Sequence, residues 1–151
     1  MGLLTFKGGL HPYDGKELSK DRPIAAYLPK GELVFPLSQH IGAPAVPCVA
    51  KGDRVLAGQR IADAGGFVSA NIHSSVSGTV KAIEPRVTVS GAKVSCIVVE
   101  NDGQYEQAEF VPVTERTPEA IIGAVKEAGI VGLGGAGFPT HVKLSPKEPD
   151  K

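Results

Sequence analysis

The sequence has few of the residues that hold metals and clusters. It contains two cysteines, Cys48 and Cys96, and no Cys-x-x-Cys pair. Because an iron–sulfur cluster normally needs four thiolates, these 151 residues cannot hold one by themselves. The four histidines show neither H-x-x-x-H nor H-x-H spacing, so no zinc site is indicated. We expect both thiols to be small buried residues, and His40 and His73 to be hydrogen-bonded structural residues.

A charge of one sign and a long apolar run are also missing. The 16 basic and 16 acidic residues cancel, which leaves no basic field to attract nucleic acid. No window approaches the roughly 20 apolar residues that cross a bilayer, and residues 1–10 hold no apolar run of the kind that a signal peptide needs. We therefore expect a soluble protein with no nucleic-acid partner and no membrane span, which reaches a membrane only through partner proteins.

Glycine and proline are abundant, at 19 and 12 residues, beside 42% hydrophobic residues for a core. This composition disfavours an all-α fold. The pattern at Gly52-Asp53-Arg54-Val55 returns at Gly91-Ala92-Lys93-Val94. Each copy predicts a glycine turn that leads into a strand of branched apolar residues, over residues 55–61 and 94–99.

The segment between the two copies, residues 71–83, is typical of extended chain with a turn at Ser77-Gly78. Two related halves of short strands predict one small β-barrel or sandwich, in which each half covers the apolar face of the other. Upstream, two short strands at Ala25–Leu28 and Glu32–Phe35 are expected to pair with the edge of this barrel.

The barrel segment also resembles a known family. Residues Lys51–Ile61, followed by Ile72–Val80, are similar to the biotinyl/lipoyl-carrier pattern of glycine turn, strand, hairpin and a small-residue segment that ends in Gly-x-Val. The resemblance implies a mainly β fold, the barrel-sandwich hybrid. In true carriers the hairpin displays a lysine that takes the cofactor, whereas Asp63–Ser69 contains none. We therefore expect no covalently attached biotin or lipoate.

A helix is predicted after the barrel. Thr117 is suited to the N-cap and Pro118 to the first helical position, and apolar residues then recur at helical spacing until Gly129, a typical helix stop. The helix has an apolar stripe that needs a surface to cover it.

The stretch that follows has five glycines in nine positions, from Gly129 to Gly137. Such a segment leaves backbone N–H groups free to wrap a phosphate or to lie against a planar ring, and the start of another helix at Phe138–Thr140 would add to anion binding. Lys143, one turn further on, would supply a positive charge. A flexible linker has the same composition, so this alternative stays open.

The order of residues in that stretch is more specific than its composition. Gly132–Thr140, with Lys143 behind it, resembles the FMN-binding loop of the NADH-oxidising flavoprotein subunit of respiratory complex I, although that family usually has an arginine where this sequence has Leu133. Together with Lys7–Pro12, Phe35–Gly42 and the carrier-like barrel, the order resembles the C subunit of the Rnf electron transport complex.

This resemblance implies electron transfer between NADH and ferredoxin, coupled through membrane partners to ion movement. It implies FMN and NADH as cofactors, with Gly132, Gly134, Gly135 and Lys143 as the candidate cofactor-binding residues and no catalytic or metal-binding residue. The iron–sulfur clusters of the family belong to a part of its longer chain that lies beyond Lys151. The partners would be the other subunits of the complex, at the cytoplasmic side of the cell membrane.

The sequence accordingly predicts three parts: residues 1–36 as an arm with short strands, 37–114 as the barrel-sandwich hybrid domain, and 115–151 as a helix and glycine-rich loop that begin an FMN/NADH-binding domain. We expect an N-terminal fragment of the family's longer chain that binds no cofactor alone. The alternative function is a non-catalytic β-barrel scaffold that docks partner subunits, with the glycine tail serving as a linker.

Overall fold

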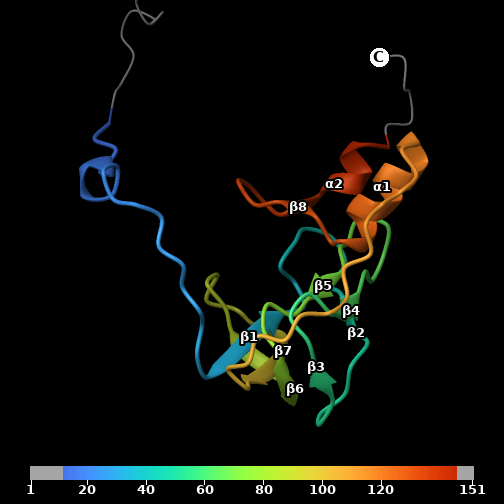
Figure 1. Cartoon of the computed structure of the whole chain (residues 1–151), viewed down its shortest axis with the longest axis horizontal. Helices are drawn as coiled ribbons and strands as arrows, with labels where there is room; N and C mark the ends of the chain where they lie inside the picture. The colour runs from blue at the N-terminus through green and yellow to red at the C-terminus, as the bar shows by residue number, and fades with distance from the viewer. Residues whose placement is uncertain (1–11, 146–151) are drawn as a thin grey trace, which may run out of the picture.

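The computed structural model describes residues 12–145. Most of the N-terminal motif at Lys7–Pro12 therefore lies outside the described residues. Two small sheets form the body, an extended arm leaves it on one side, and two helices stand over the other side (Figure 1). The protein is mainly β, as predicted.

The larger sheet has four antiparallel strands in the order β1-β7-β6-β3, and the smaller one has three in the order β2-β4-β5. A third, two-stranded sheet, β8-β9, lies near the C-terminal helices. The bounds are η1 (Lys16–Leu18), β1 (Glu32–Pro36), β2 (Val46–Pro47), β3 (Arg54–Val55), β4 (Arg60–Asp63), β5 (Ile72–His73), β6 (Gly78–Val87), β7 (Lys93–Asn101), α1 (Pro118–Glu127), β8 (Val131–Gly132), β9 (Phe138–Pro139) and α2 (Thr140–Lys143).

The repeat is confirmed at its turns and wrong in its first strand. Gly52 and Gly91 both have positive φ, +96° and +78°, as glycine turns require. The expected strand over 55–61, however, is broken between β3 and β4. Gly58 donates its N–H to the Ser74 carbonyl, which turns the chain before β4 begins. The second copy runs unbroken as β7.

Two other expected elements differ from the structure. The bend between β5 and β6 lies at residues 75–76, and Gly78 begins β6. Glycine is needed there because a Cβ would meet the Glu100 carbonyl oxygen of β7 at 2.0 Å. Residues 25–28 form no strand, whereas β1 forms as expected and pairs with β7 at the sheet edge.

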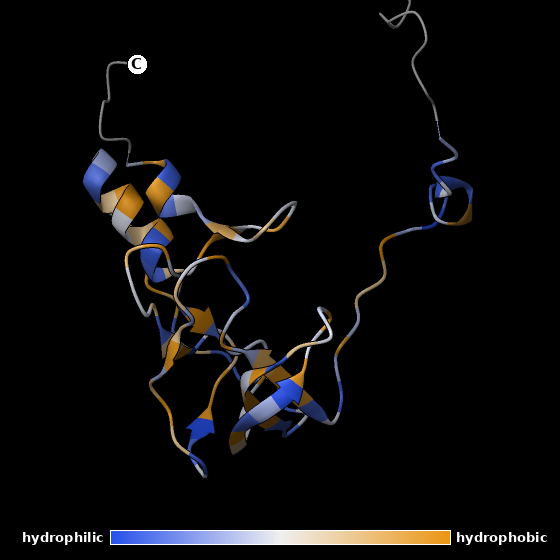
Figure 2. Cartoon of the chain, turned by 180° about the vertical axis from the view of Figure 1, so that it is seen from behind, coloured by the Kyte–Doolittle hydropathy of each residue, from blue (hydrophilic) through white to orange (hydrophobic). Residues whose placement is uncertain are grey.

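The strands of the barrel alternate between its interior and its surface. In β6, Val80 is buried while the flanking Thr79 and Lys81 are exposed, which is the two-residue period of a strand with one covered face. Hydrophobic and hydrophilic bands accordingly follow one another along the ribbons (Figure 2).

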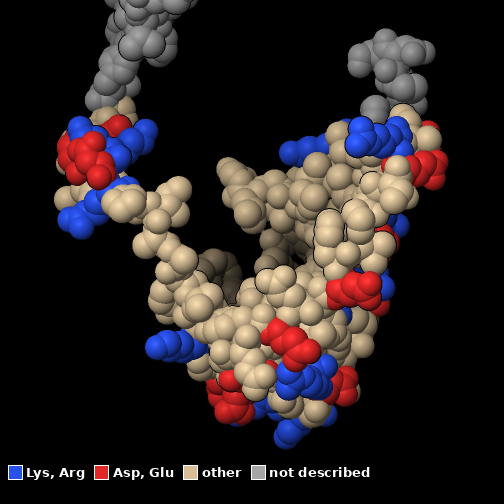
Figure 3. Space-filling view, viewed as in Figure 1, with Lys and Arg blue, Asp and Glu red and all other residues tan. Residues whose placement is uncertain are grey.

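Charged side chains of both signs lie next to one another on the lower end of the barrel (Figure 3). They form ion pairs between strands and turns, such as Lys81 with Glu32 and Arg54 with Glu106. Exposed pairs of this kind add little stability. Their mixed signs agree with the absence of a single-signed field.

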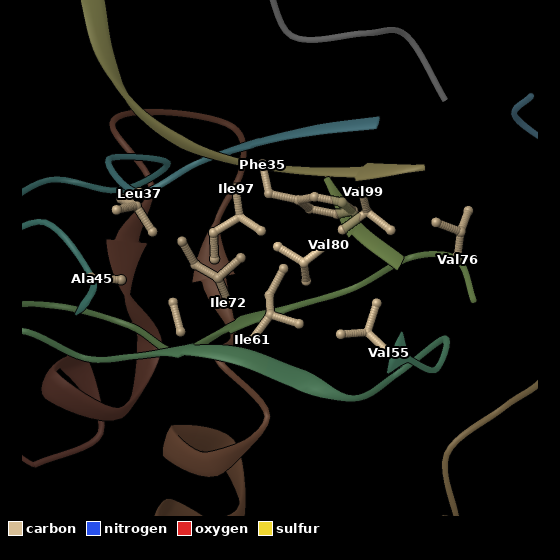
Figure 4. Close-up of a cluster of buried hydrophobic side chains, with 11 residues drawn as sticks. Phe35, Leu37, Ala45, Val55, Ile61, Ile72, Val76, Val80, Ile97 and Val99 are labelled. Atoms are coloured by element: carbon tan, nitrogen blue, oxygen red, sulfur yellow. The ribbon is translucent and has the colours of Figure 1, made fainter. Parts of the chain in front are cut away.

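The core lies between the two sheets. Ile61 of β4, Val80 of β6 and Val99 of β7 are fully buried there and point toward one another (Figure 4). Burying each such side chain contributes about 1.5–3 kcal/mol. The cluster is Phe35, Leu37, Ala45, Val55, Ile61, Ala62, Ile72, Val76, Val80, Ile97 and Val99.

The C-terminal helix forms as predicted. The Thr117 hydroxyl accepts a hydrogen bond from the Ala120 N–H, Pro118 is the first helical residue, and Gly129 follows the helix with a φ of +63°. No residue of α1 is fully buried: Ala124 and Val125 of its apolar stripe are partly covered, whereas Ile121 stays exposed.

Candidate functional site

The glycine-rich stretch forms a β-hairpin. Strands β8 and β9 pair antiparallel, with Val131 opposite Pro139 and Gly132 opposite Phe138. A turn over residues 133–136 joins them, closed by a hydrogen bond of 3.3 Å from the Gly135 N–H to the Gly132 carbonyl. The four-residue helix α2 begins directly after β9. Its first N–H, on Thr140, is already bonded to the Ile130 carbonyl at 2.9 Å, so the hairpin rather than the helix end presents the candidate site.

The candidate glycines differ in their surroundings. Gly134 and Gly135 are exposed on the turn, and a Cβ at either would meet no atom within 4 Å. Gly132 lies in β8, where a Cβ would stand 3.5 Å from the Lys143 ammonium nitrogen. The structure thus brings Gly132 and Lys143 together and leaves the other two glycines on an open surface.

Lys143 is exposed on α2, and its Nζ lies 5.6 Å from the centre of the Phe138 ring. This distance is within the range of a cation–π contact. The contact keeps the ammonium group over the hairpin. A positive charge therefore lies beside a turn whose glycines carry no side chains, which is a suitable arrangement for an anionic group.

The hairpin is seated on the barrel. Gly137 is buried, and a Cβ there would meet the Gln39 carbonyl oxygen at 2.8 Å and the His40 Cα at 3.0 Å. Pro139 is fully buried. At the other end, a Cβ on Gly129 would meet the Asn71 carbonyl oxygen at 2.2 Å. The linker interpretation is therefore wrong for residues 129–145, because this segment packs against the backbone of the barrel and is not a free connection.

Polar contacts reinforce this seat. The Asn71 amide donates to the Glu127 carbonyl at the end of α1, 3.3 Å away, and Arg60 of β4 pairs with the Glu127 carboxylate at 2.7 Å. Arg60 belongs to the smaller sheet and Asn71 directly precedes its strand β5, so both contacts join the end of α1 to that sheet.

His40 is buried, as expected for a structural histidine. Its Nε2 lies 3.0 Å from the Ala70 carbonyl oxygen and 3.2 Å from the Ser69 hydroxyl. Burial lowers the pKa of His40, because a charged ring would lose its hydration. Burial also lowers the pKa of His73, which is half-buried on β5.

The cysteines offer no metal centre. Both are free thiols, but Cys48 is exposed while Cys96 is buried, so the expectation of two buried thiols is wrong for Cys48. The Cys48 side chain lies outside the core and reaches the Arg60 carbonyl, 3.6 Å from its sulfur. Within residues 12–145 no group of three or more metal-ligating side chains gathers. None of the helices in that range is long and apolar enough to cross a membrane.

An apolar groove that sequence reasoning missed runs beside α1. Its volume is about 520 Å³, and it lies between the helix and the connector that precedes it. The connector carries a signal for it in the apolar run at Phe110–Val113, but such a run by itself indicates no more than extended chain. The lining residues are Phe110, Val111, Val113, Ile121, Ala124, Val125, Glu127, Ala128 and Ile130.

Comparison with known families settles the identity of the barrel, because residues 4–104 match the RnfC barrel sandwich hybrid domain. This chain belongs to the RnfC family. It is 44% identical over 153 residues to the C subunit of the proton-translocating ferredoxin:NAD(+) oxidoreductase complex of Clostridium ljungdahlii, a match that covers 99% of this chain and 33% of the relative.

Two further relatives show the same relationship. Identity is 45% to the C subunit of the Na(+)-translocating ferredoxin:NAD(+) oxidoreductase complex of Acetobacterium woodii, over 97% of this chain and 34% of that protein. It is 42% to the C subunit of an ion-translocating oxidoreductase complex of Vibrio cholerae, over 94% of this chain and 19% of that protein. The chain thus spans about a third or less of the length of these relatives, which are subunits of oxidoreductase complexes.

Proposed function

We propose that this chain forms the N-terminal part of the C subunit of a membrane-bound, ion-translocating ferredoxin:NAD oxidoreductase. This RnfC protein carries electrons between NADH and the iron–sulfur and flavin centres of the complex, from a peripheral position on the cytoplasmic side of the membrane. The proposal is supported by three relatives of 42–45% identity that are named as the C subunits of such complexes.

Residues 115–151 begin the FMN- and NADH-binding unit in this proposal, and the hairpin contacts FMN. The residues present fit the cofactor. Gly134 and Gly135 leave a turn that a planar ring or a phosphate can approach closely, and the Lys143 ammonium beside Gly132 supplies a charge for a phosphate. Leu133, 89% exposed, supplies no polar contact where the complex I loop usually has arginine. We therefore assign Gly132, Gly134, Gly135 and Lys143 as the FMN contacts.

A bound flavin accepts a hydride as an electron pair and releases electrons singly, which is the chemistry that joins NADH to iron–sulfur centres. The residues of this chain bind and orient it. The hairpin, held by the barrel through Gly137 and Gly129, gives the cofactor a surface that does not have to be ordered at the moment of binding. Such preorganisation raises affinity.

The apolar groove beside α1 supports the view that this helix belongs to a larger unit. Ile121 and Ile130 remain about half exposed on it, and Phe110 is 84% exposed. A contiguous apolar surface of this kind marks an interaction site. In the proposal, the further chain found in the longer relatives covers the groove, together with the cysteine-rich segments that hold the iron–sulfur clusters.

The scaffold function remains the second candidate, because the barrel has its own complete core. The flavoprotein and scaffold functions are distinguished by the flavin content of the complete gene product, purified without added cofactor. A flavoprotein subunit releases FMN on acid treatment in a ratio near one per chain, and its absorbance at the flavin band is bleached by NADH. A product that neither contains FMN nor binds it on titration would contradict the flavoprotein function and favour the scaffold function.

A further inference from the structure

Two loops of the barrel are fastened to each other beneath the glycine hairpin. We call residues 37–43 the seat loop and residues 64–70 the support loop. The Ala43 N–H donates to the Val68 carbonyl at 3.0 Å, and the Ser69 hydroxyl donates to the Ala43 carbonyl at 2.8 Å. A Cβ on Gly42 would meet the Val68 carbonyl oxygen at 2.0 Å. The loops therefore touch along their backbones.

The His40 ring is a cross-link between these loops. A carbonyl oxygen only accepts, so Nε2 must carry the proton that it donates to Ala70. The Ser69 hydroxyl, which already gives its own proton to Ala43, is a second acceptor for the same N–H. This fixes the tautomer with a bare Nδ1, which is buried and has no hydrogen-bond partner among residues 12–145.

The backbone of the same residue is the surface on which the hairpin rests. Gly137, which directly precedes β9, lies so close that its Cβ would stand 3.0 Å from the His40 Cα and 3.5 Å from the His40 Cβ. Its φ of +68° is the left-handed region that favours glycine. A shift of the seat loop therefore moves Gly137, and with it the turn that carries Gly134 and Gly135.

We propose that His40 is a positioning residue for the glycine hairpin: by tying the seat loop to Ser69 and Ala70, it fixes the place at which Gly137 sits and so the orientation of the turn. As a role in flavin binding, this inference rests on the function proposed above. As a statement about the hairpin, it rests on the contacts alone. A histidine that served only the barrel core would instead affect all parts of the fold alike.

The test uses the complete gene product and four variants. His40→Leu removes the donor and keeps an apolar side chain of similar bulk, and His40→Gln restores an N–H close to the position of Nε2. Ser69→Ala removes one acceptor of the His40 N–H together with the hydroxyl's own bonds to Ala43 and Gly65, and leaves the bond from His40 to Ala70. It loosens the same pair of loops and serves if His40→Leu does not fold. Val80→Ala, which makes a cavity in the core on β6 and removes no contact of His40, is the control for lost stability.

The first readout is amide hydrogen exchange, which needs no flavin. In His40→Leu we expect exchange in residues 129–140 to accelerate by about tenfold or more while β7 changes by less than about twofold, since local opening is independent of global unfolding. Ser69→Ala should show the same pattern, His40→Gln should lie near the unmodified protein, and Val80→Ala should affect β7 at least as much as the hairpin. Equal acceleration in the hairpin and in β7 of His40→Leu, or no change in either, overturns the inference.

The second readout is FMN affinity at a temperature where all variants are folded. His40→Leu should weaken binding by about tenfold or more, with His40→Gln and Val80→Ala within about threefold of the unmodified protein. If the unmodified protein binds no FMN but its hairpin exchange responds as expected, the proposed function fails and the positioning of the hairpin stands. If it binds FMN and His40→Leu binds equally well, the role of His40 in the flavin site is overturned.

Discussion

Gly137 lies against the backbone of His40, so close that a Cβ on the glycine would stand 3.0 Å from the His40 Cα. This relationship joins the glycine hairpin, near the end of the described chain, to the first loop of the barrel. It makes the candidate cofactor site a joint product of barrel and hairpin.

A methyl group at this position is therefore expected to be costly. Gly137→Ala combines a strained φ of +68° with contacts of 2.8 and 3.0 Å to backbone atoms, which would have to shift. Gly91→Ala is the matched control, because Gly91 also has a positive φ, +78°, and no atom lies within 4 Å of its Cβ position. We expect Gly91→Ala to cost about 1 kcal/mol and Gly137→Ala at least about twice that, measured by chemical denaturation. Equal losses would show that the hairpin is not seated on His40.

Acid should destabilise the protein through one buried and two partly buried histidines. Burial lowers the pKa of His40, His73 and His141 below the ordinary value of 6.5. Above that pH the rings are neutral in both the folded and the unfolded chain, so the fold carries no penalty. As the pH falls below 6.5 the unfolded chain takes up protons first, and stability is lost until the folded pKa values are passed.

We therefore expect the thermal midpoint to fall between about pH 7 and pH 5, and to fall less steeply in His40→Gln, which removes one of the three groups. The midpoint is followed by circular dichroism in buffers of constant ionic strength. A midpoint that is level over this range would contradict the burial of the rings.

No cofactor is expected to be attached covalently. The loop that corresponds to the carrier hairpin, Asp63–Ser69, has no lysine, and Lys81 is on the paired strand β6. After expression beside biotin and lipoate ligases, intact mass spectrometry should give the unmodified mass. An added mass equal to either cofactor would restore the carrier interpretation.

Much of the fold could be predicted because its signals are local. Thr117, Pro118 and Gly129 mark the ends of α1 in the sequence itself, and the turns at Gly52 and Gly91 follow from glycine alone. The break between β3 and β4 could not be predicted. It depends on the Ser74 carbonyl, which accepts from Gly58 only after β5 has folded back beside it.

The candidate site, too, could be predicted from the sequence only in part. The composition around Gly134 and Gly135 marks an open backbone surface, and the structure adds Lys143 beside Gly132. The support beneath the hairpin could not be predicted, because Gly137 and Gly129 owe their roles to His40 and Asn71, which are far away in the sequence. A contact between distant backbones leaves no pattern in a single sequence.

The central claim is that the hairpin and Lys143 bind FMN, and it is tested most directly by the affinity of the complete gene product for FMN in two lysine variants. Lys143→Ala removes the charge beside Gly132, whereas Lys93→Ala, on an exposed position of β7, removes an equal charge from the barrel. We expect Lys143→Ala to lose about 1.5–3 kcal/mol of binding free energy, or roughly 10- to 150-fold in Kd, with Lys93→Ala unchanged. Fluorescence titration measures both. If Lys143→Ala binds FMN as tightly as Lys93→Ala and the unmodified protein, the assignment of this lysine to the cofactor site is contradicted.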